Sequence, residues 1–595
     1  MPAQRWAFIS LLFVGLMFSL PFLQYHHNYP LPGFYGEWLA ALLGLAALGL
    51  LVQRRWWEDF SLPRIALVPL ALFAVLLGQL ALGMAPYPQQ ILLAELYLLW
   101  ACGLMVLGHV LKAEFGWEKL AHTLAVFLLA GGVLNALAGL LQHYNWHTIF
   151  DAVVSMKVSS SVYGNLAQPN HFADYLALAL VSALFLHARG LLRKAFLVPC
   201  AALLLFTMAL SGSRSSWLYL FAIAASAAGW HRAEGSAASR RAWYGALALL
   251  AGFVLAQVLA QLPALAPAHS PVLTAAQRLL MQAEDPSGSI RFYLWSEAWR
   301  MFLQAPLLGL GWGQFPWQHF SWLEQLNASS VTGWYSHAHN FVAQLAAETG
   351  LAGLVPVLLG LGYWLLGLRR AAVGVERWWL LTLMAVLLIH SLLEAPLWFA
   401  YFLGIAAFLL GAGEAHGVRI DLRRIGRPAM VLMLAFGAAA AFNLESNYRS
   451  LEGMLFARYD SASQARADGA NLAGKHAALM KIHQESLLTP YIELAYAGAI
   501  TLDRDHLRDK LDLNTRAMRF APVGDAVYRQ AVLLALAGED EAARRQLERA
   551  ARAYPDHLKV FAMSLRQLAE KEPARFAGML EWMQQEENAS AVRAK

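Results

Sequence analysis

Long apolar runs separated by short polar connections make up most of the chain before about residue 443. A membrane-spanning helix needs about 20 mostly apolar residues, because its backbone amides must be satisfied inside the segment. Thirteen runs reach or approach this length, so the pattern predicts an all-α, polytopic membrane protein of about 13 transmembrane helices. They are approximately Trp6–Leu23, Trp38–Val52, Ile65–Met84, Ile91–Leu111, Leu120–Leu141, Phe172–Leu186, Phe196–Leu210, Trp217–Trp230, Trp243–Leu262, Leu351–Leu368, Trp378–Leu393, Trp398–Leu410 and Ala429–Phe442.

The charges of the connections predict the topology. Lys and Arg are retained on the cytoplasmic side, and they gather in alternate connections, whereas QYHHNYPLPGFYGE and APYPQQ are nearly free of them. The cation-poor side is therefore outward, and an odd helix count places the C-terminal region there too. We call this outward side periplasmic. The first run follows Arg5 without a small-residue cleavage site, so we interpret it as a retained helix.

Two outward segments are long, His143 to His171 and Pro263 to about Gly350, and long outward loops often carry function. After residue 443 the chain becomes charged and Ala-rich, and AMRFAP recurs as AARAYP at nearly the period of a tetratricopeptide repeat. We predict a transmembrane domain over 1–443, with a large periplasmic loop at about 263–350, and a periplasmic tetratricopeptide-like domain over 444–595. Such repeats commonly bind proteins, although a helical cap without a partner also fits.

Composition narrows the function classes. The 595 residues are 58% hydrophobic and 14% charged, too few charges to coat a water-soluble body of this size. The net charge of +6 is spread over the connections, which argues against nucleic acid as a partner. Cys102 and Cys200 lie in apolar runs and offer neither a disulfide framework nor a Cys-rich zinc site.

The outward segment GNLAQPNHFADY places Gln168, Asn170, His171 and Tyr175 at the mouth of a helix. On its own this pattern favours a structural interpretation, in which Asn170 caps the helix and Pro169 prevents backward extension. A substrate-binding role is the alternative.

The hairpin SGSRSSW places Arg214 on the side that is otherwise poor in cations. A guanidinium at a helix N-terminus opposes the helix dipole and needs an anionic partner. It can fork onto phosphate oxygens, which suits a diphosphate at the bilayer surface. Binding to ordinary lipid headgroups is the alternative.

The segment SGSIRFYLWSEAWRMFLQAPLLGLGWGQF predicts an aromatic, amphipathic helix at the membrane interface, followed by a Gly-rich turn. Arg291 is the candidate for a second diphosphate contact, and Trp and Tyr faces are candidates for stacking on sugar rings. A surface helix without a catalytic part is the alternative, which we prefer for Arg300.

The segment SHAHNFVAQLAAETGL carries His337, His339, Asn340 and Glu348 just before a span. An imidazole, with a pKa of about 6.5, can accept a hydroxyl proton at neutral pH, and His339 is the preferred base. The two His could share a metal only in an extended backbone, and the outward loops contain no DxD-like acidic pair. We therefore expect no metal and no other cofactor.

The segment HSLLEAPLWFAY places His390, Glu394 and Tyr401 at the outward end of a helical hairpin broken at Pro396. An ionisable residue near membrane depth is a functional candidate. Glu394 could orient the His, or be only a structural partner for an Arg.

Together these segments resemble the bacterial protein O-oligosaccharyltransferases of the pilin glycosylation ligase type, within the O-antigen ligase and polymerase superfamily. SGSRSS, RFYLWSEAWRMFLQAPLLGLGWGQF and HNFVAQLAAETGL carry the superfamily resemblance. GNLAQPNHFADY, HSLLEAPLWFAYF and the helical tail carry the narrower one.

The resemblance implies metal-independent, inverting transfer of an oligosaccharide from undecaprenyl diphosphate to Ser or Thr of pilin-like or other periplasmic proteins. It places the essential His at His339, and the diphosphate contacts at Arg214 and Arg291. Gln168 and Tyr401 match further polar positions, with the register at Tyr401 ambiguous. The complete candidate set is catalytic His339 and His337, diphosphate-binding Arg214 and Arg291, and substrate-binding Gln168, Asn170, His171, Asn340, Glu394 and Tyr401.

Three other functions remain open. An O-antigen ligase acting on lipid A core and an O-antigen polymerase would keep the chemistry and change the acceptor. A transporter or assembly platform would dispense with the chemistry. However, transporters place ionisable groups near the midplane, and here the candidates gather at one face without an inverted repeat.

Overall fold

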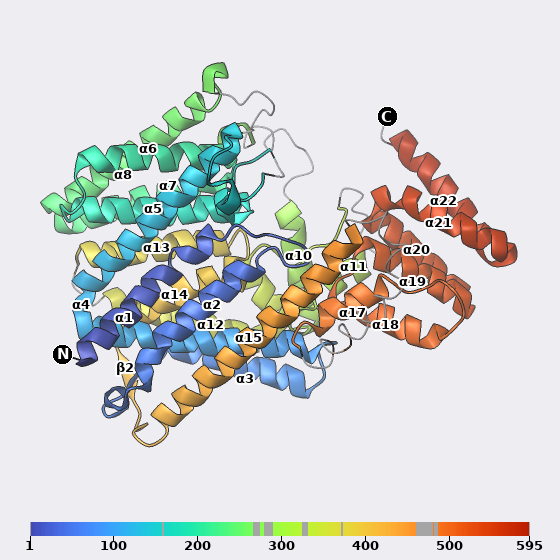
Figure 1. The fold of residues 1–595 in the computed structure, drawn as a ribbon, viewed down its shortest axis with the longest axis horizontal. Helices are drawn as coiled ribbons and strands as arrows, with labels where there is room; N and C mark the ends of the chain where they lie inside the picture. The colour runs from blue at the N-terminus through green and yellow to red at the C-terminus, as the bar shows by residue number, and fades with distance from the viewer. Residues whose placement is uncertain are drawn as a thin grey trace.

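The computed structural model describes residues 2–157, 160–265, 274–278, 290–323, 331–369, 373–459, 480, 483 and 486–593. Helices dominate these ranges, and Figure 1 shows them as one large bundle with a smaller group of helices at one end. The bundle contains α1 (Pro2–Met17), α2 (Phe34–Leu48), α3 (Leu67–Ala81), α4 (Pro88–Tyr144), α5 (Pro169–Ala188), α6 (Lys194–Leu210), α7 (Ser215–Glu234), α8 (Ala237–Leu259), α12 (Phe341–Arg369), α13 (Val375–Ser391), α14 (Ala400–Gly413) and α15 (Gly426–Tyr459). Two short helices, α10 (Ile290–Gln304) and α11 (Phe315–Trp322), lie between the bundle and the smaller group.

The bundle has the character of a multi-pass membrane protein. Eight of the described helices are long and apolar enough to cross a membrane, and α6 and α14 are shorter apolar helices. Each of the thirteen predicted apolar runs falls largely on helical structure. Two of the runs share α4, in which Gly116 adopts non-helical angles (φ 75°, ψ 163°) that divide the helix in two.

Within the described ranges, the one departure from the all-α prediction is a short antiparallel pair of strands, β1 (Ser61–Pro63) and β2 (Gly417–Arg419). It joins two connections that are far apart in sequence. Ser61 pairs with Arg419 and Pro63 with Gly417.

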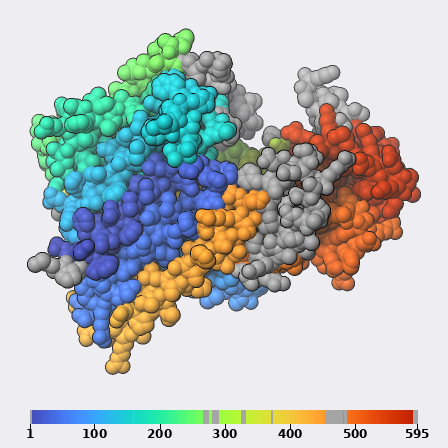
Figure 2. Space-filling view, viewed as in Figure 1, coloured from blue at the N-terminus to red at the C-terminus, as the bar shows by residue number. Residues whose placement is uncertain are grey.

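Burial orders the spans from the centre of the bundle to its edge. In α5, 94% of the apolar window is buried, whereas the values are 28% in α3, 22% in α12 and 11% in α15. Figure 2 shows α15 as a ridge across one face of the bundle. Helices α3, α12 and α15 therefore present most of their apolar side chains to lipid, whereas α5 lies in the protein core.

The smaller group at the C-terminal end comprises α17 (Thr489–Ala497), α18 (Leu507–Phe520), α19 (Gly524–Ala537), α20 (Asp540–Ala553), α21 (Leu558–Lys571) and α22 (Pro573–Arg593). The two repeated sequence segments lie at the ends of α18 and α20, and the Tyr554 hydroxyl of one donates to the Pro522 carbonyl of the other at 2.6 Å. The Tyr87 hydroxyl, between α3 and α4, donates to Glu493 at 2.7 Å and ties this group to the bundle. α15 continues through the predicted domain boundary at 443–444 as one helix.

Close backbone contact holds α14 against α4. A Cβ at Gly411 would lie 1.9 Å from the Met105 carbonyl oxygen, and one at Gly108 would lie 2.3 Å from the Phe408 carbonyl oxygen. Small residues of this kind allow membrane helices to approach closely.

Gly411→Ala should therefore push α14 away from α4 and destabilise the fold by about 1–3 kcal/mol. Thermal unfolding of the detergent-purified protein measures the effect as a lowered Tm. The matched control is Gly362→Ala in α12, where a Cβ meets nothing within 4 Å. Equal Tm values for the two variants would contradict the close packing of α14 on α4.

Candidate functional site

A buried carboxylate, Glu394, lies at the centre of the predicted polar residues. It follows α13, and its N–H donates to the His390 carbonyl at 2.8 Å, which extends that helix by a turn. Its Oε2 accepts a hydrogen bond from His339 Nδ1 at 2.6 Å. Its Oε1 accepts from Arg291 Nη2 at 2.7 Å and from Asn170 Nδ2 at 2.8 Å. Residues from α5, α10 and the segment before α12 therefore meet on one side chain, which is 8% exposed.

The surroundings of Glu394 determine its charge state. Burial alone would favour the neutral acid, but hydrogen bonding and charge from His339, followed by the charge of Arg291, outweigh it and lower the pKa of Glu394 to about 2. Glu394 is therefore an anion at neutral pH, and its fixed charge can hold two positively charged or polarised partners.

Glu394 also fixes the tautomer of His339. A carboxylate can only accept, so Nδ1 of His339 carries the proton that it donates, and in the neutral imidazole the lone pair is on Nε2. The backbone of His339 has φ 50°, a left-handed conformation that costs a non-glycine residue free energy. The side chain remains 25% exposed. The structure thus leaves Nε2 as the ring nitrogen that Glu394 does not engage, on a partly exposed side chain.

His337 lies beside His339 but is held differently. The two ring centroids are 4.4 Å apart. Burial of His337, together with the charge of His339, lowers the pKa of His337 to about 4, so it is neutral at pH 7. In the part of the chain that the structure describes, its Nδ1 has no hydrogen-bond partner, and no group of three His, Cys, Asp or Glu is arranged to hold a metal.

Arg214 lies just before α7, and its neighbour Ser213 connects to Glu394 through two hydrogen bonds. The hydroxyl of Ser213 donates to Asn170 Oδ1 at 2.8 Å, and the amide of Asn170 donates to Glu394. Burial, followed by the positive charges of Arg291 and Arg278, lowers the pKa of Arg214. Three guanidiniums therefore share this region, and no ion pair links Arg214 to a carboxylate of the described residues.

Arg278 was missed by the sequence interpretation. It lies on helical structure described over residues 275–278, whose start is closed by two reciprocal hydrogen bonds between Thr274 and Gln277. Its Nη2 donates to the Ser161 hydroxyl at 2.5 Å. The T-x-x-Q capping signature and the rarity of outward cations were readable in the sequence. However, the nearness of Arg278 to Arg214 depends on the fold.

Two predicted substrate-binding residues serve the backbone in this structure. The side-chain oxygen of Gln168 caps α5 by accepting from the His171 N–H. The sequence interpretation of Asn170 as that cap is wrong, because Pro169 already begins the helix and the Asn170 amide binds Glu394 and Ser213 instead. Asn340 Oδ1 accepts from the N–H groups of Val342 and Ala343 and so caps α12.

The last two predicted residues, His171 and Tyr401, lie behind the site in the protein core. Each is 4% exposed, and the Tyr401 hydroxyl lies 3.4 Å from His171 Nδ1. Next to them is a pair that the sequence interpretation did not assign, in which His390 Nδ1 lies 3.0 Å from Asp174 Oδ2 with both side chains fully buried. This pair links α5 to α13, the helices that position Asn170 and Glu394.

The Gly-rich turn after α10 fixes the start of α12. The N–H of Leu310 donates to the Ala347 carbonyl at 2.9 Å, and Glu348 Oε1 accepts from the Phe315 N–H at 3.1 Å. Gly309 has φ 70°, and a Cβ there would lie 2.2 Å from the Glu348 carbonyl carbon, so glycine is required. The turn also stacks Trp312 on Trp398 with centroids 5.8 Å apart.

Comparisons with protein families match three segments of the chain. Residues 199–358 match the O-antigen ligase family, residues 162–187 match the protein glycosylation ligase family, and residues 378–568 match the C-terminal part of the virulence factor membrane-bound polymerase family. Asn170, Arg214, Arg291, His339 and Glu394 all fall within these matches.

Two curated proteins of Acinetobacter baylyi are similar to the chain. One is a general O-oligosaccharyltransferase, 28% identical over 413 residues that cover 69% of this chain and 70% of that protein. The other is a ComP-specific O-oligosaccharyltransferase, 24% identical over 283 residues that cover 46% of this chain and 47% of that protein.

Glu394→Gln should destabilise the fold by about 2 kcal/mol at pH 7, because the amide loses charge-assisted hydrogen bonds to His339 and Arg291. A carboxyl group with a lowered pKa stabilises the fold above its ordinary pKa of 4.5, and that stabilisation is lost as pH falls toward about 2. The Tm difference between wild type and variant, measured in detergent, should be full at pH 7 and shrink steadily below pH 4.5. A difference that stays constant down to pH 3 would contradict the ionised state of Glu394.

Proposed function

Because the chain belongs to the O-antigen ligase superfamily, in which it is of the protein glycosylation ligase type, we propose that it transfers an oligosaccharide from undecaprenyl diphosphate to Ser or Thr hydroxyls of proteins. The observation that carries this proposal is the placement of His339 and Arg291 on the two oxygens of Glu394. One carboxylate thereby aligns a base for the acceptor beside a cation for the leaving group.

The proposed reaction is a single displacement at the anomeric carbon. The acceptor hydroxyl oxygen forms the new bond to this carbon, and His339 Nε2 takes its proton. The bond from the carbon to the diphosphate oxygen breaks, and undecaprenyl diphosphate leaves with the electron pair. Glu394 stabilises the imidazolium that forms, as a carboxylate does for the His of a hydrolase triad. Attack from the face opposite the leaving group gives an inverting outcome.

The guanidiniums would bind the diphosphate and stabilise the charge that develops on it. A diphosphate leaving group needs little acid catalysis, so positioning and electrostatic stabilisation supply most of the rate. Glu394 neutralises part of the charge of Arg291, so Arg214 and Arg278 contribute most of the net positive charge. Their mutual repulsion in the unliganded protein favours binding of an anion. Metal-independent transfer follows if these residues are sufficient.

The cellular setting is part of the proposal. Thirteen spans would place the site in the periplasm, at the surface of the bacterial inner membrane. The transmembrane glycosyltransferase domain would cover 1–443, and 444–595 would form a periplasmic, tetratricopeptide-like domain. The pairing of the repeated segments through Tyr554 and Pro522 supports the repeat, and pilin-like proteins are the expected acceptors.

One observation favours a second function. The match of residues 378–568 to a membrane-bound polymerase family would also suit transfer to another lipid-linked glycan, and the ligase match would suit transfer to lipid A core. A deletion strain that loses pilin glycan and keeps its lipopolysaccharide ladder supports the protein ligase. The reverse pattern refutes it.

Reconstitution tests the activity itself. Purified protein, a lipid-linked oligosaccharide and a pilin would be combined in chelator, and mass spectrometry would measure the mass of the pilin. A glycan-sized increase in chelator supports metal-independent protein glycosylation. An increase that appears only when a divalent cation is restored refutes the metal-independent mechanism.

His339→Ala should lower the transfer rate by about 10²–10⁴-fold, the usual contribution of a general base, while the protein remains inserted and abundant. His337→Ala is the matched comparison and should cost less than tenfold, because His337 packs on His339 without contacting Glu394. Rates are measured in the same reconstituted assay. Retained activity in His339→Ala with loss in His337→Ala would move the base to His337.

Arg278→Ala should raise the KM for the lipid-linked donor about tenfold, corresponding to one charge-assisted contact of about 1.4 kcal/mol. Arg278→Lys should reverse part of the rise in KM, since it restores the positive charge but not the two-pronged hydrogen bonding of the guanidinium. Arg300→Ala, an exposed Arg on α10, is the control and should leave KM unchanged. A KM for Arg278→Ala equal to that of the control removes Arg278 from donor binding.

A further inference from the structure

A cavity of about 1370 Å³ lies on the lipid-facing side of the bundle, and we name it the lateral cavity. Its lining runs through most of the depth of the spans and is apolar there. The spans contribute Ala41 of α2, Leu72 of α3, Leu93 of α4, Leu361 of α12, Ala406 of α14 and Ala440 of α15. An occupant of this part must be apolar.

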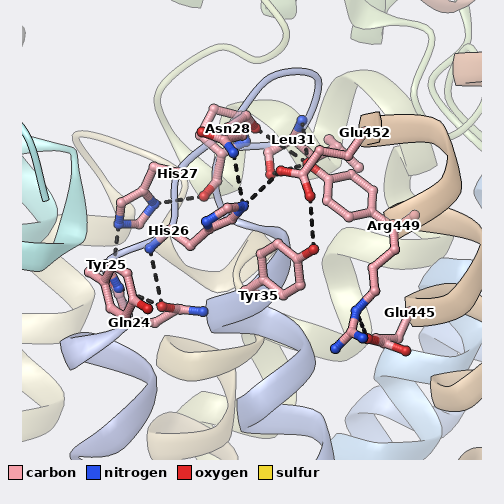
Figure 3. Close-up of polar contacts among 12 residues, drawn as sticks. Gln24, Tyr25, His26, His27, Asn28, Leu31, Tyr35, Glu445, Arg449 and Glu452 are labelled. Atoms are coloured by element: carbon pink, nitrogen blue, oxygen red, sulfur yellow. Dashed lines mark hydrogen bonds and ion pairs between the residues drawn. The ribbon is translucent and has the colours of Figure 1, made fainter. Parts of the chain in front are cut away.

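Two walls of the lateral cavity lie at the edge of the bundle. α15 packs along α2, where Trp38 Nε1 donates to the Ala441 carbonyl at 2.9 Å. Figure 3 shows the outer ends of these helices joined as well: Glu452 accepts from the Tyr35 hydroxyl at 2.9 Å and contacts His26 Nε2 at 2.8 Å. α3 and α12 form the opposite wall, and with α15 they are the least buried spans. Only these peripheral helices separate this side of the cavity from the lipid.

The outer end of the lateral cavity is lined differently. Gln90, Tyr491, Asp525 and Arg529 contribute polar groups there, and three of the four belong to the C-terminal helices. The lining thus changes from aliphatic to polar and charged at the outer end of the bundle. It matches a molecule that is apolar within the membrane and becomes a polar chain outside it.

The lateral cavity and the Arg residues of the site are separate features of the structure. Ser336, Phe341 and Trp398, close in sequence to His339 or Glu394, line the cavity. Glu394 connects through Asn170 and Ser213 toward Arg214. None of Arg214, Arg278 and Arg291 is among the described lining residues.

From this arrangement we propose that the lateral cavity receives the acceptor, a protein anchored by an apolar membrane helix whose Ser or Thr hydroxyl lies just outside the bilayer. This inference rests on the proposed function. If the guanidiniums hold the leaving diphosphate, an inverting displacement requires the nucleophile to approach from the opposite face of the sugar. The cavity lacks these guanidiniums, so it can take a substrate other than the diphosphate, and its polar outer lining suits a peptide chain that leaves the membrane beside the C-terminal helices.

The experiment compares two forms of one acceptor protein in liposomes, one with its membrane helix and one without, using the same lipid-linked donor. Ala440→Trp fills the cavity from α15, and Leu72→Trp fills it from α3. The measured quantity is kcat/KM for the anchored acceptor divided by kcat/KM for the truncated acceptor. Each Trp variant should lower this ratio at least fivefold. The matched control is Ala439→Trp, on the exposed side of the same helix and outside the cavity lining, which should keep the wild-type ratio.

Cross-linking tests the position directly. In a protein with Cys102 and Cys200 replaced by Ser, a cysteine introduced by Ala440→Cys should form a disulfide with cysteines on one face of the acceptor's membrane helix. Ala439→Cys should not.

Three results would overturn the inference. They are an unchanged ratio in both Trp variants, no cross-link at residue 440, or an equal loss for both acceptor forms with a raised KM for the donor. The last result would indicate that the cavity binds the lipid tail of the donor. In each case, if the wild-type enzyme still glycosylates the truncated acceptor, the proposed function stands. If the wild-type enzyme glycosylates neither acceptor form, the proposed function itself is refuted.

Discussion

The organisation of the site depends on burying one ionised carboxylate. Glu394 is 8% exposed and keeps its charge because three donors, from His339, Arg291 and Asn170, surround it. A buried charge is costly unless it is paired and hydrogen-bonded, so the fold is most stable when all three donors surround Glu394. This requirement ties the α13–α14 turn to α5, to α10 and to the segment before α12, which are otherwise separate parts of the chain.

Several structural features serve this one interaction. The Asp174–His390 pair fixes α5 against α13, and the Gly-rich turn at Gly309 fixes the start of α12. The left-handed backbone of His339 carries local strain, which is tolerated where surrounding contacts determine the conformation. The result is a preorganised base and cation, the condition under which electrostatic stabilisation is most effective. The Arg residues of the site are also separate from the apolar lateral cavity, and the proposal of separate donor and acceptor sites rests on this separation.

Much of the fold could be predicted from the sequence because the bilayer imposes a strong, local rule. Apolar runs of sufficient length must be helical, and all thirteen coincide with helical structure. Glu394 was found because ionisable residues near membrane depth are functional candidates, and Arg214 because the outward connections are otherwise poor in cations. The resemblance added their order along the chain. The roles assigned to Arg291 and His339 in catalysis remain predictions.

Other features were not readable because they depend on long-range contacts. Asn170 resembled a helix cap, but its amide is committed to Glu394 and Ser213, and Gln168 caps the helix instead. Arg278 lies outside the sequence segments that carry the family resemblance, and only the fold brings it near Arg214. The lateral cavity is lined by residues from Tyr29 to Arg529, so no sequence window could contain it.

The measurement that tests the central claim most directly is kcat for Glu394→Gln at saturating donor and acceptor. Glutamine keeps the size of the side chain but loses the charge that fixes the His339 tautomer and stabilises its protonated form. The account predicts a kcat lowered by at least about 100-fold, within the range of general-base catalysis. A kcat within a factor of about two of wild type would contradict it, because Glu394 would then be only a structural link between helices.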